Sequence, residues 1–249
     1  MVTIGRPDQV RAVLEDPGFI VPPAQAGGEN VDVGWVRARV SRFANGEEHR
    51  QRRALVTELL AGVPARALRD DAFDRTRRRA SDVIFDLART VPTDVLAAAL
   101  GVEVSAADVG AVARVYHPHV EADRAGDEAA ARLVEACGGP ADERAAARVA
   151  LFVQARDATA SLIENAAGVM LRTSPRPDPA AVIDRVLLDE PPVRATRRLD
   201  GTAVLVLDLA RAQRESGQLF TFGAGHRACP GQPHARAIAH GVLDALRQR

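Results

Sequence analysis

The hydrophobic residues of this chain recur mostly at the spacing of an α-helix. Near its start, Val10, Val13 and Leu14 fall on one helical face, and Pro7 suits a first helical turn. The longest helix should end before the prolines that begin at Pro175, because proline cannot continue a helix. The periodicity predicts helices over residues 7–15, 46–60, 66–88, 92–100, 106–116, 125–137, 141–171, 180–188 and 232–246.

Two segments follow the pattern of a β-strand instead. Residues 2–4 form a short β-like start, and residues 202–209 (TAVLVLDL) are the clearest strand of a β-rich patch near the C-terminus. Glycine and proline mark the loops, but no linker or internal repeat separates independent units. The sequence therefore predicts one domain over residues 1–249, mainly α-helical with a small β region.

The composition is that of an ordinary globular protein. Hydrophobic residues make up 47% of the 249 residues and charged residues 27%, so burial of apolar side chains can offset the entropy lost on folding. Thirty-three basic and 33 acidic residues leave no net charge, and no basic run marks a surface for polyanions. Aromatic residues are only 4%, too few for a base-stacking platform. We therefore expect neither nucleic acid nor a membrane as a partner.

The two cysteines, Cys137 and Cys229, could in principle pair, but nothing else in the sequence indicates an oxidising compartment. The N-terminal segment is interrupted by charges and has no apolar core of signal-peptide length. No stretch approaches the roughly 18 apolar residues that a membrane-spanning helix needs. We therefore expect reduced thiols and a cytoplasmic location.

A glycine-rich loop near the C-terminus, residues 222–231 (FGAGHRACPG), carries the clearest chemical signal. Gly223 and Gly225 allow tight turns, and Cys229 directly precedes a helix expected to begin near Gln232. A helix N-terminus favours the thiolate, so we expect a lowered pKa for this cysteine. No second cysteine or histidine stands at zinc spacing, which favours a single metal ligand, with heme iron as the natural candidate. An inert cysteine in an ordinary turn is the alternative.

This loop resembles the cysteine-ligand loop of the cytochrome P450 family, F-G-x-G-x-[HR]-x-C-x-G, at every fixed position. The resemblance implies a shortened, divergent cytochrome P450-like helical fold that binds heme b (iron protoporphyrin IX) through Cys229. It further implies that Phe222 packs against the ligand side of the heme and that Arg227 contacts a heme propionate, whereas His226 falls on a variable position. A thiolate ligand donates electron density to iron and favours O–O cleavage.

Two further segments are similar to propionate-binding parts of the same family. Residues 42–53 (RFANGEEHRQRR) resemble the start of a helix in which a histidine and an arginine four residues later bind a propionate. His49 and Arg53 have this spacing, which places them on one helix face, although a solvated basic face has the same pattern. Residues 191–198 (PPVRATRR) resemble a stretch whose final arginine, here Arg198, binds a propionate.

The long helix contains a stretch, residues 154–166, that resembles the family's oxygen-binding helix but departs from it. The family has an acid followed by a threonine, and together they deliver protons to oxygen. Here Asp157 is followed by Ala158, and Thr159 stands one position later, rotated by about 100°. Asp157 and Thr159 are the candidate catalytic residues. Their arrangement favours peroxide over reductive dioxygen activation as the oxygen source.

A second departure concerns the Glu-x-x-Arg pair by which the family fastens a helix to the loop beneath the heme. Its places fall on Arg185 and Leu188, which cannot form that pair, while Asp184 could form a rearranged one. The chain is also shorter than typical members of the family. The motifs therefore cover separate blocks of the sequence.

The resemblance implies a heme-thiolate oxidoreductase, a monooxygenase or peroxygenase that acts on a small apolar substrate in secondary metabolism. A reductive cycle would need a ferredoxin-type redox partner. Two alternatives stay open. One is a heme protein that does not oxygenate, such as a Lewis-acid isomerase, dehydratase or cyclase, or a gas sensor. The other is a heme-free descendant that serves as a partner protein.

Overall fold

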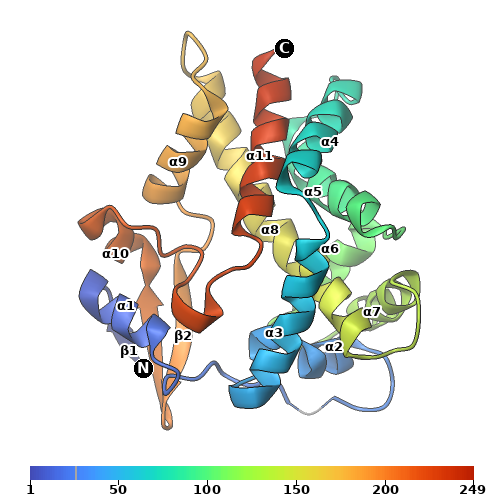
Figure 1. Cartoon of the computed structure of the whole chain (residues 1–249), viewed down its shortest axis with the longest axis vertical. Helices are drawn as coiled ribbons and strands as arrows, with labels where there is room; N and C mark the ends of the chain where they lie inside the picture. Colours follow the sequence, from blue (N-terminus) through green and yellow to red (C-terminus); the bar gives the residue numbers. More distant parts are fainter. Residues whose placement is uncertain (26) are drawn as a thin grey trace.

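The computed structural model describes residues 1–25 and 27–249 (Figure 1). These residues contain eleven α-helices, two short 3-10 helices and three β-strands. The elements are, in chain order, β1 (Val2–Ile4), α1 (Pro7–Glu15), α2 (Val33–Arg39), η1 (Ser41–Phe43), α3 (Gly46–Ala61), α4 (Ala65–Arg78), α5 (Ile84–Leu100), α6 (Ala106–Val115), α7 (Arg124–Ala136), α8 (Glu143–Leu171), α9 (Pro179–Asp189), β2 (Ala195–Asp200), β3 (Ala203–Asp208), α10 (Leu209–Ser216), η2 (Gly225–Arg227) and α11 (Gln232–Arg247). The prediction of a mainly α-helical fold with a small β region is confirmed.

Helix α8, with 29 residues, runs through the helical part of the molecule (Figure 1). The Asp142 side chain caps its first turn by accepting a hydrogen bond from the N–H of Ala145 at 2.9 Å. Its many alanines let neighbouring helices approach closely, and α5, α6, α9 and α11 all pack against it. None of the described helices, α8 included, is both long and apolar enough to span a membrane.

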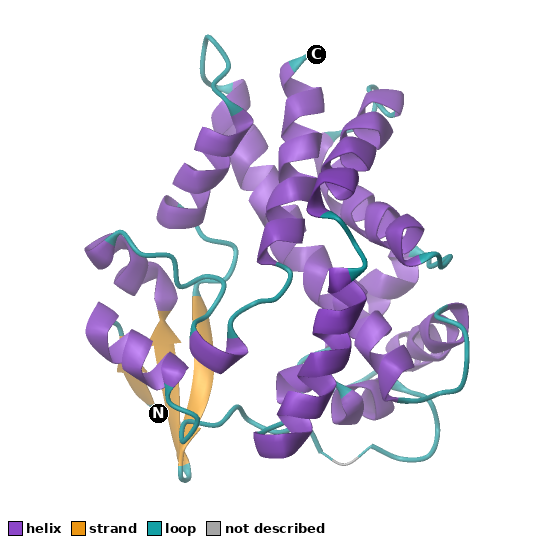
Figure 2. Cartoon of the chain, viewed as in Figure 1, coloured by secondary structure: helices purple, strands orange, loops and turns teal. Residues whose placement is uncertain are grey.

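The three strands form one small sheet beside the helices (Figure 2). Strand β3 is central, parallel to β1 and antiparallel to β2, with Arg198 opposite Leu205. Leu205 and Leu207 belong to an apolar cluster that also contains residues of α1, of α10 and of the segment after α10. Those further members are Val10, Val13, Leu14, Leu209, Ala212 and Phe220. The sheet, α1 and α10 thereby hold the chain just before the glycine-rich loop.

The boundary predicted between helices over residues 66–88 and 92–100 is wrong. The break falls earlier, between α4 and α5. Arg79 closes the turn there: its carbonyl accepts from the N–H of Asp82 at 3.1 Å, and its Nε donates to the Asp82 carboxylate at 2.8 Å. Pro92 is buried inside α5, where it removes one backbone donor without ending the helix. The helix boundary therefore lies at this hydrogen-bonded turn and not at the proline.

Two short helices, α2 and α10, are absent from the sequence prediction. Each begins after an aspartate whose carboxylate accepts a backbone hydrogen bond: Asp32 from Trp35 at 2.6 Å, and Asp208 from Arg211 at 2.9 Å. Elements of seven and eight residues are too short for a helical period to stand out. Helix α10 also shortens the strand predicted over residues 202–209.

Helix α11 packs closely on α4 (Figure 1). At Gly241, an added Cβ would overlap the carbonyl oxygen of Arg69 and lie 3.0 Å from the Cβ of Ala72. Glycine therefore permits a backbone contact between the two helices that a larger residue would prevent. Because α11 begins at Gln232, this contact lies on the helix that directly follows Cys229.

Candidate functional site

The Cys229 loop, residues 222–231, is closed by backbone hydrogen bonds. The N–H of Cys229 donates to the carbonyl of Phe222 at 2.7 Å, and the N–H of Ala228 donates to the carbonyl of Gly225 at 3.1 Å. Gly223 and Gly225 have φ angles of +71° and +62°, which side chains other than glycine rarely adopt. The loop therefore turns back so that Cys229 lies beside the residue where it began.

Gly225 also lets the loop contact α1. A Cβ at this position would lie 2.9 Å from the Cα of Glu15 and 3.3 Å from the carbonyl oxygen of Leu14. Neither backbone atom can move without shifting α1. The positive φ and the close approach thus both require glycine, which explains the second glycine of the motif.

The sulfur of Cys229 faces the N-terminal end of α11. By solvent-accessible surface Cys229 counts as exposed. Protein atoms nevertheless surround its sulfur in most directions. Burial raises the pKa of the Cys229 thiol, while hydrogen bonds from the N–H groups of Gly231 and Gln232 and two nearby arginines lower it by less. The prediction of a lowered pKa is therefore wrong. The predicted donors are present, but desolvation outweighs them.

Helix α3 carries His49 and Arg53 toward this loop. His49 is only 4% exposed, and its ring lies edge-on to that of His226, with 5.7 Å between the ring centroids. Arg53, one turn later, donates from Nη2 to the carbonyl oxygen of Ala228, next to Cys229. The structure thus brings the predicted i, i+4 pair to the Cys229 loop.

Arg227 extends from the loop to the segment before α3. Its Nη2 donates to the carbonyl oxygen of Ala44 at 2.7 Å and to the Oδ1 of Asn45 at 2.9 Å. Asn45 also exchanges two hydrogen bonds with the backbone of Val21, each 3.0 Å long. Asn45 is therefore a link between three segments, a role that the sequence prediction misses.

Arg198 comes from strand β2 and is 6% exposed. Its Nη1 donates to the Oγ1 of Thr196 at 3.3 Å and to the carbonyl oxygen of Arg197 at 2.9 Å. Burial, with a smaller contribution from the nearby Arg42, lowers the pKa of Arg198 to about 10. No carboxylate acts against this shift among the described residues.

His49, Arg53, Arg198 and Arg227 form what we call the cation cluster. Burial first, then the charges of neighbouring cations, lowers the pKa of His49 to about 4. The neighbours are Arg227, His226, Arg53 and Arg198. Burial likewise lowers the pKa of Arg227 to about 10, with contributions from Arg198 and Arg53. Within the described chain no carboxylate compensates the cluster, and the Nε of Arg227 is buried without a hydrogen-bond partner.

Two other basic side chains near the cluster, His226 and Arg42, are missing from the predicted site. His226 occupies a variable position of the motif yet packs on His49. Arg42 lies near enough to lower the pKa of both Arg198 and Cys229. Neither has a local signal, because each reaches the site through the folding of a loop. For Arg42, the one hint in the sequence is its place seven positions before His49.

The candidate catalytic residues on α8 do not come together. Asp157 is exposed and accepts a hydrogen bond from Nη1 of Arg156 at 2.5 Å. Thr159 is 2% exposed and points into the helical core. The two side chains therefore lie on different faces of the helix, as their spacing predicts.

The rearranged ion pair that Asp184 of α9 could form is present. Asp184 accepts from Arg236 of α11, so α9 is joined to the helix that follows the Cys229 loop. Arg185 pairs within its own helix with Asp189 at 3.4 Å. Both side chains of the first pair lie partly at the surface, so the ion pair contributes little by itself.

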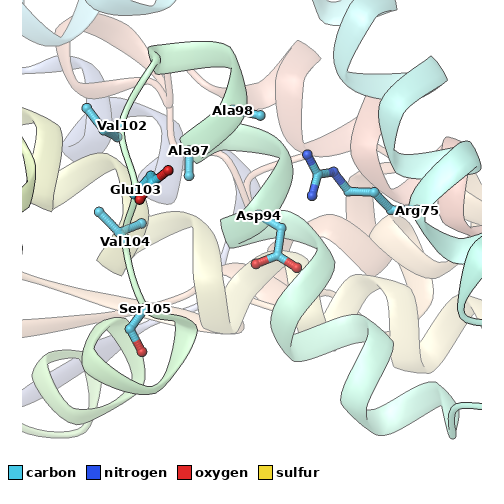
Figure 3. Close-up of a pocket in the computed structure, with 8 residues that line it drawn as sticks. All are labelled: Arg75, Asp94, Ala97, Ala98, Val102, Glu103, Val104 and Ser105. Atoms are coloured by element: carbon cyan, nitrogen blue, oxygen red, sulfur yellow. The ribbon is translucent and has the colours of Figure 1, made fainter.

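A hollow of about 590 Å³ lies elsewhere, between α4, α5 and the connection to α6 (Figure 3). The charged side chains of Arg75, Asp94 and Glu103 line it, together with small and aliphatic side chains of α5 and of the connection. Burial raises the pKa of Asp94. The hollow includes neither Cys229 nor any residue of the cation cluster, so it is separate from the site described above.

No family model matches the sequence, and no curated protein matches it. Solved structures do match in fold. P450BioI in complex with an acyl carrier protein ligated to hexadec-9Z-enoic acid is 18% identical, with a TM-score of 0.78, and covers 99% of this chain and 84% of that chain. A thermophilic cytochrome P450 from Sulfolobus tokodaii is 15% identical, with a TM-score of 0.74 and coverages of 99% and 86%.

A third match is the cytochrome P450 enzyme CxnD, described as acting in C–S bond formation in chuangxinmycin biosynthesis. It is 15% identical, with a TM-score of 0.73, and covers 99% of this chain and 80% of that chain. The likeness extends along almost the whole chain, whereas the sequence motifs cover separate blocks. The chain therefore has the cytochrome P450 fold.

Proposed function

We propose that this chain is a heme-thiolate oxidoreductase that binds heme b with Cys229 as the iron ligand. The observation that carries the proposal is the cation cluster, which lies beside an exposed thiol without a compensating acid. The other cysteine, Cys137, is buried in the helical core. The two propionates of a heme are carboxylates of the kind that such a cluster lacks.

The side chains present fit the propionates of a heme. Arg227 has a buried Nε without a partner, and Arg198 donates only within its own strand among the described residues. Arginine suits this role because its planar guanidinium binds carboxylates through two parallel hydrogen bonds. His49 and Arg53 supply the remaining donors on one face of α3. Without an anion, the positive charges of the three arginines in this partly buried set would repel one another.

A bound heme supplies an iron atom whose thiolate ligand favours cleavage of an O–O bond. The chain's own residues would tune that ligand. The N–H groups of Gly231 and Gln232 hydrogen-bond to the Cys229 sulfur and temper its donation of electron density. We assign Phe222, which is partly exposed and packed on the helical core, to the ligand side of the ring.

We further propose a monooxygenase or peroxygenase that acts on a small apolar substrate, with peroxide the more effective oxidant. Reductive activation of dioxygen needs delivered protons, and Asp157 and Thr159 lie on different faces of α8. Peroxide is already reduced and protonated. A reductive cycle would use a ferredoxin-type partner. A role in secondary metabolism is supported by the description of CxnD.

One observation favours a second candidate. Asp157 is paired with Arg156 at the surface, so a proton relay from this acid is interrupted. A heme protein that does not oxygenate needs no such relay. It would use iron as a Lewis acid for isomerisation, dehydration or cyclisation, or as a gas sensor. Turnover or a ligand response without any oxidant would select this candidate.

The deciding experiment is the absorption spectrum of the reduced, carbon monoxide-bound protein after heme loading. We expect the strongly red-shifted band of thiolate ligation in the parent chain, its loss in Cys229→Ser and its retention in Cys137→Ala. A band typical of imidazole or neutral-thiol ligation, or a chain that takes no heme, would overturn the proposal. Turnover with hydrogen peroxide, compared with turnover with a reductase, then separates the two oxygenating routes.

A further inference from the structure

The side chain of Gln213, on α10, joins three separate parts of the chain and is fully buried. Its Nε2 donates to the carbonyl oxygens of Leu187 at 2.9 Å and Leu188 at 3.4 Å, at the end of α9. Its Oε1 accepts from the N–H groups of Phe220 at 2.7 Å and Thr221 at 2.5 Å. One neutral amide thus uses both of its donors and both acceptor positions.

The carbonyls that Gln213 binds lack their ordinary helical partners. In a helix, a carbonyl accepts from the N–H four residues later, and for Leu187 and Leu188 those positions are Pro191 and Pro192. Proline has no N–H to donate. The amide of Gln213 therefore replaces two donors that the sequence removes, at a place where water has little access.

The oxygen of the Gln213 amide binds the segment that leads to Cys229. The Oε1 of Gln213 accepts a hydrogen bond from the N–H of Thr221, and the next residue is Phe222. The carbonyl of Phe222 in turn accepts a hydrogen bond from the N–H of Cys229 at 2.7 Å. The hydroxyl of Thr221 accepts from Val193 at 3.3 Å, which adds a link toward β2. Phe220 is 1% exposed in the apolar cluster of the sheet. The segment that Gln213 holds is thus one residue from the carbonyl that holds Cys229.

We propose that Gln213 is a positioning residue for Cys229. Its amide fixes residues 220–222 relative to the end of α9, and the Phe222 carbonyl then sets the position of the sulfur. The inference rests on the proposed function only for the identity of the group that Cys229 binds. A carboxylate at position 213 would face two carbonyl oxygens, and an alkyl side chain would leave four backbone groups without a partner.

The test uses the cofactor-free chain and compares Gln213→Ala with Gln218→Ala. Gln218 is an exposed glutamine whose Oε1 accepts from Arg11 at 2.7 Å, so it is the matched control. In Gln213→Ala we expect hydrogen exchange at residues 220–229 to rise about tenfold or more relative to α8, because buried N–H groups lose their acceptor. The control should keep the parent's rates.

Alkylation of the thiol gives a second measurement of the same loop. Iodoacetamide labelling with peptide mass spectrometry should proceed about threefold faster or more at Cys229 in Gln213→Ala, because a loosened loop packs less protein around the sulfur and lets the reagent approach it from more directions. Buried Cys137 is the internal reference in the same molecule. Neither measurement depends on heme or on enzymatic activity.

Gln213→Glu keeps the shape of the side chain and covers the case in which Gln213→Ala does not fold. At pH 8 its carboxylate faces the two carbonyls of α9, whereas at pH 5 a protonated carboxyl can donate to one of them. Corrected for intrinsic rates, exchange at residues 220–229 should exceed that of the parent at pH 8. It should return to within about twofold at pH 5.

Unchanged exchange and alkylation at the Cys229 loop in these variants would overturn the proposal. An equal rise throughout the chain would also overturn it, because that result indicates global destabilisation. After heme loading, Gln213→Ala should show a smaller share of the thiolate-type band than Gln218→Ala. A parent chain that takes no heme would overturn the proposed function, while the exchange and alkylation results would still decide the role of Gln213.

Discussion

Arg227 donates a hydrogen bond to the carbonyl oxygen of Ala44 across 183 residues of sequence. This contact joins the Cys229 loop to the segment that leads into α3. It also places the guanidinium within reach of the rest of the cation cluster, where an unscreened positive charge favours an anionic ligand.

We expect Arg227→Gln to weaken heme binding about tenfold or more, because a charge-assisted contact to a propionate is lost. Loss of the hydrogen bonds to Ala44 and Asn45 should lower the free energy of unfolding of the cofactor-free chain by about 1–2 kcal/mol. Heme titration and chemical denaturation measure the two effects. Arg50→Gln, at an exposed position of α3, should change neither. Equal heme affinity in both variants would contradict the proposed contact.

His49 should make the stability of the cofactor-free chain depend on pH. Its pKa is about 4 in the folded chain and 6.5 in its unperturbed state, so the unfolded chain binds the extra proton between these values. The free energy of unfolding is then unaffected by His49 above pH 6.5. It falls as the pH drops toward 4, by up to about 3 kcal/mol. His49→Gln should flatten this part of the profile in denaturant titrations. A profile as steep as that of the parent would contradict the shift.

Heme should reduce the same dependence if its propionates lie beside His49. A nearby carboxylate favours the charged imidazolium and so raises the pKa of His49. Titration of the His49 ring by NMR, with and without a diamagnetic heme analogue, measures this shift. An unchanged pKa after binding would place the propionates elsewhere.

Gly225→Ala should destabilise the chain more than Gly138→Ala. Both glycines have a positive φ, +62° and +69°, so both variants carry the same backbone strain. Only at Gly225 would the new Cβ meet backbone, 2.9 Å from the Cα of Glu15, whereas nothing lies within 4 Å at Gly138. We expect the difference in free energy of unfolding to exceed about 1 kcal/mol, measured by thermal denaturation. Equal losses would show that the loop does not press on α1.

Asp157→Asn should have little effect on peroxide-driven turnover. The carboxylate is exposed and paired with Arg156, so its removal should change stability by less than about 0.5 kcal/mol. Thr159→Ala should cost more stability, about 1 kcal/mol, because Thr159 is buried. A tenfold loss of peroxide turnover in Asp157→Asn would assign the acid a catalytic role that its position does not suggest.

The parts of the site that the sequence predicts are those encoded by short spacings. His49 and Arg53 share a face because they are four residues apart on a helix, and the positive φ angles of the Cys229 loop follow from its glycines. Cys229 itself stands where the motif places it, directly before α11. Most helices are likewise found where an apolar period of 3.6 residues places them.

The remaining parts depend on contacts between distant segments. Asn45 precedes α3, where an asparagine would be expected to cap the helix, but its side chain instead binds Val21 and Arg227. Gln213 lies in a helix too short to be predicted, and its partners come from two other elements. The pKa of Cys229 depends on how much protein surrounds it, which no local pattern encodes.

The close crossing at Gly241 has a consequence for how the chain tolerates change. Because α11 cannot slide along α4 without a clash at Arg69, the sulfur of Cys229 sits at the end of a helix whose axial position is locked. We therefore expect insertions or deletions in the connections before α6 and after α7, which belong to neither helix of this crossing, to leave the thiol in place. Under the proposed function, such a scaffold keeps the iron ligand in place while other surfaces of the chain change.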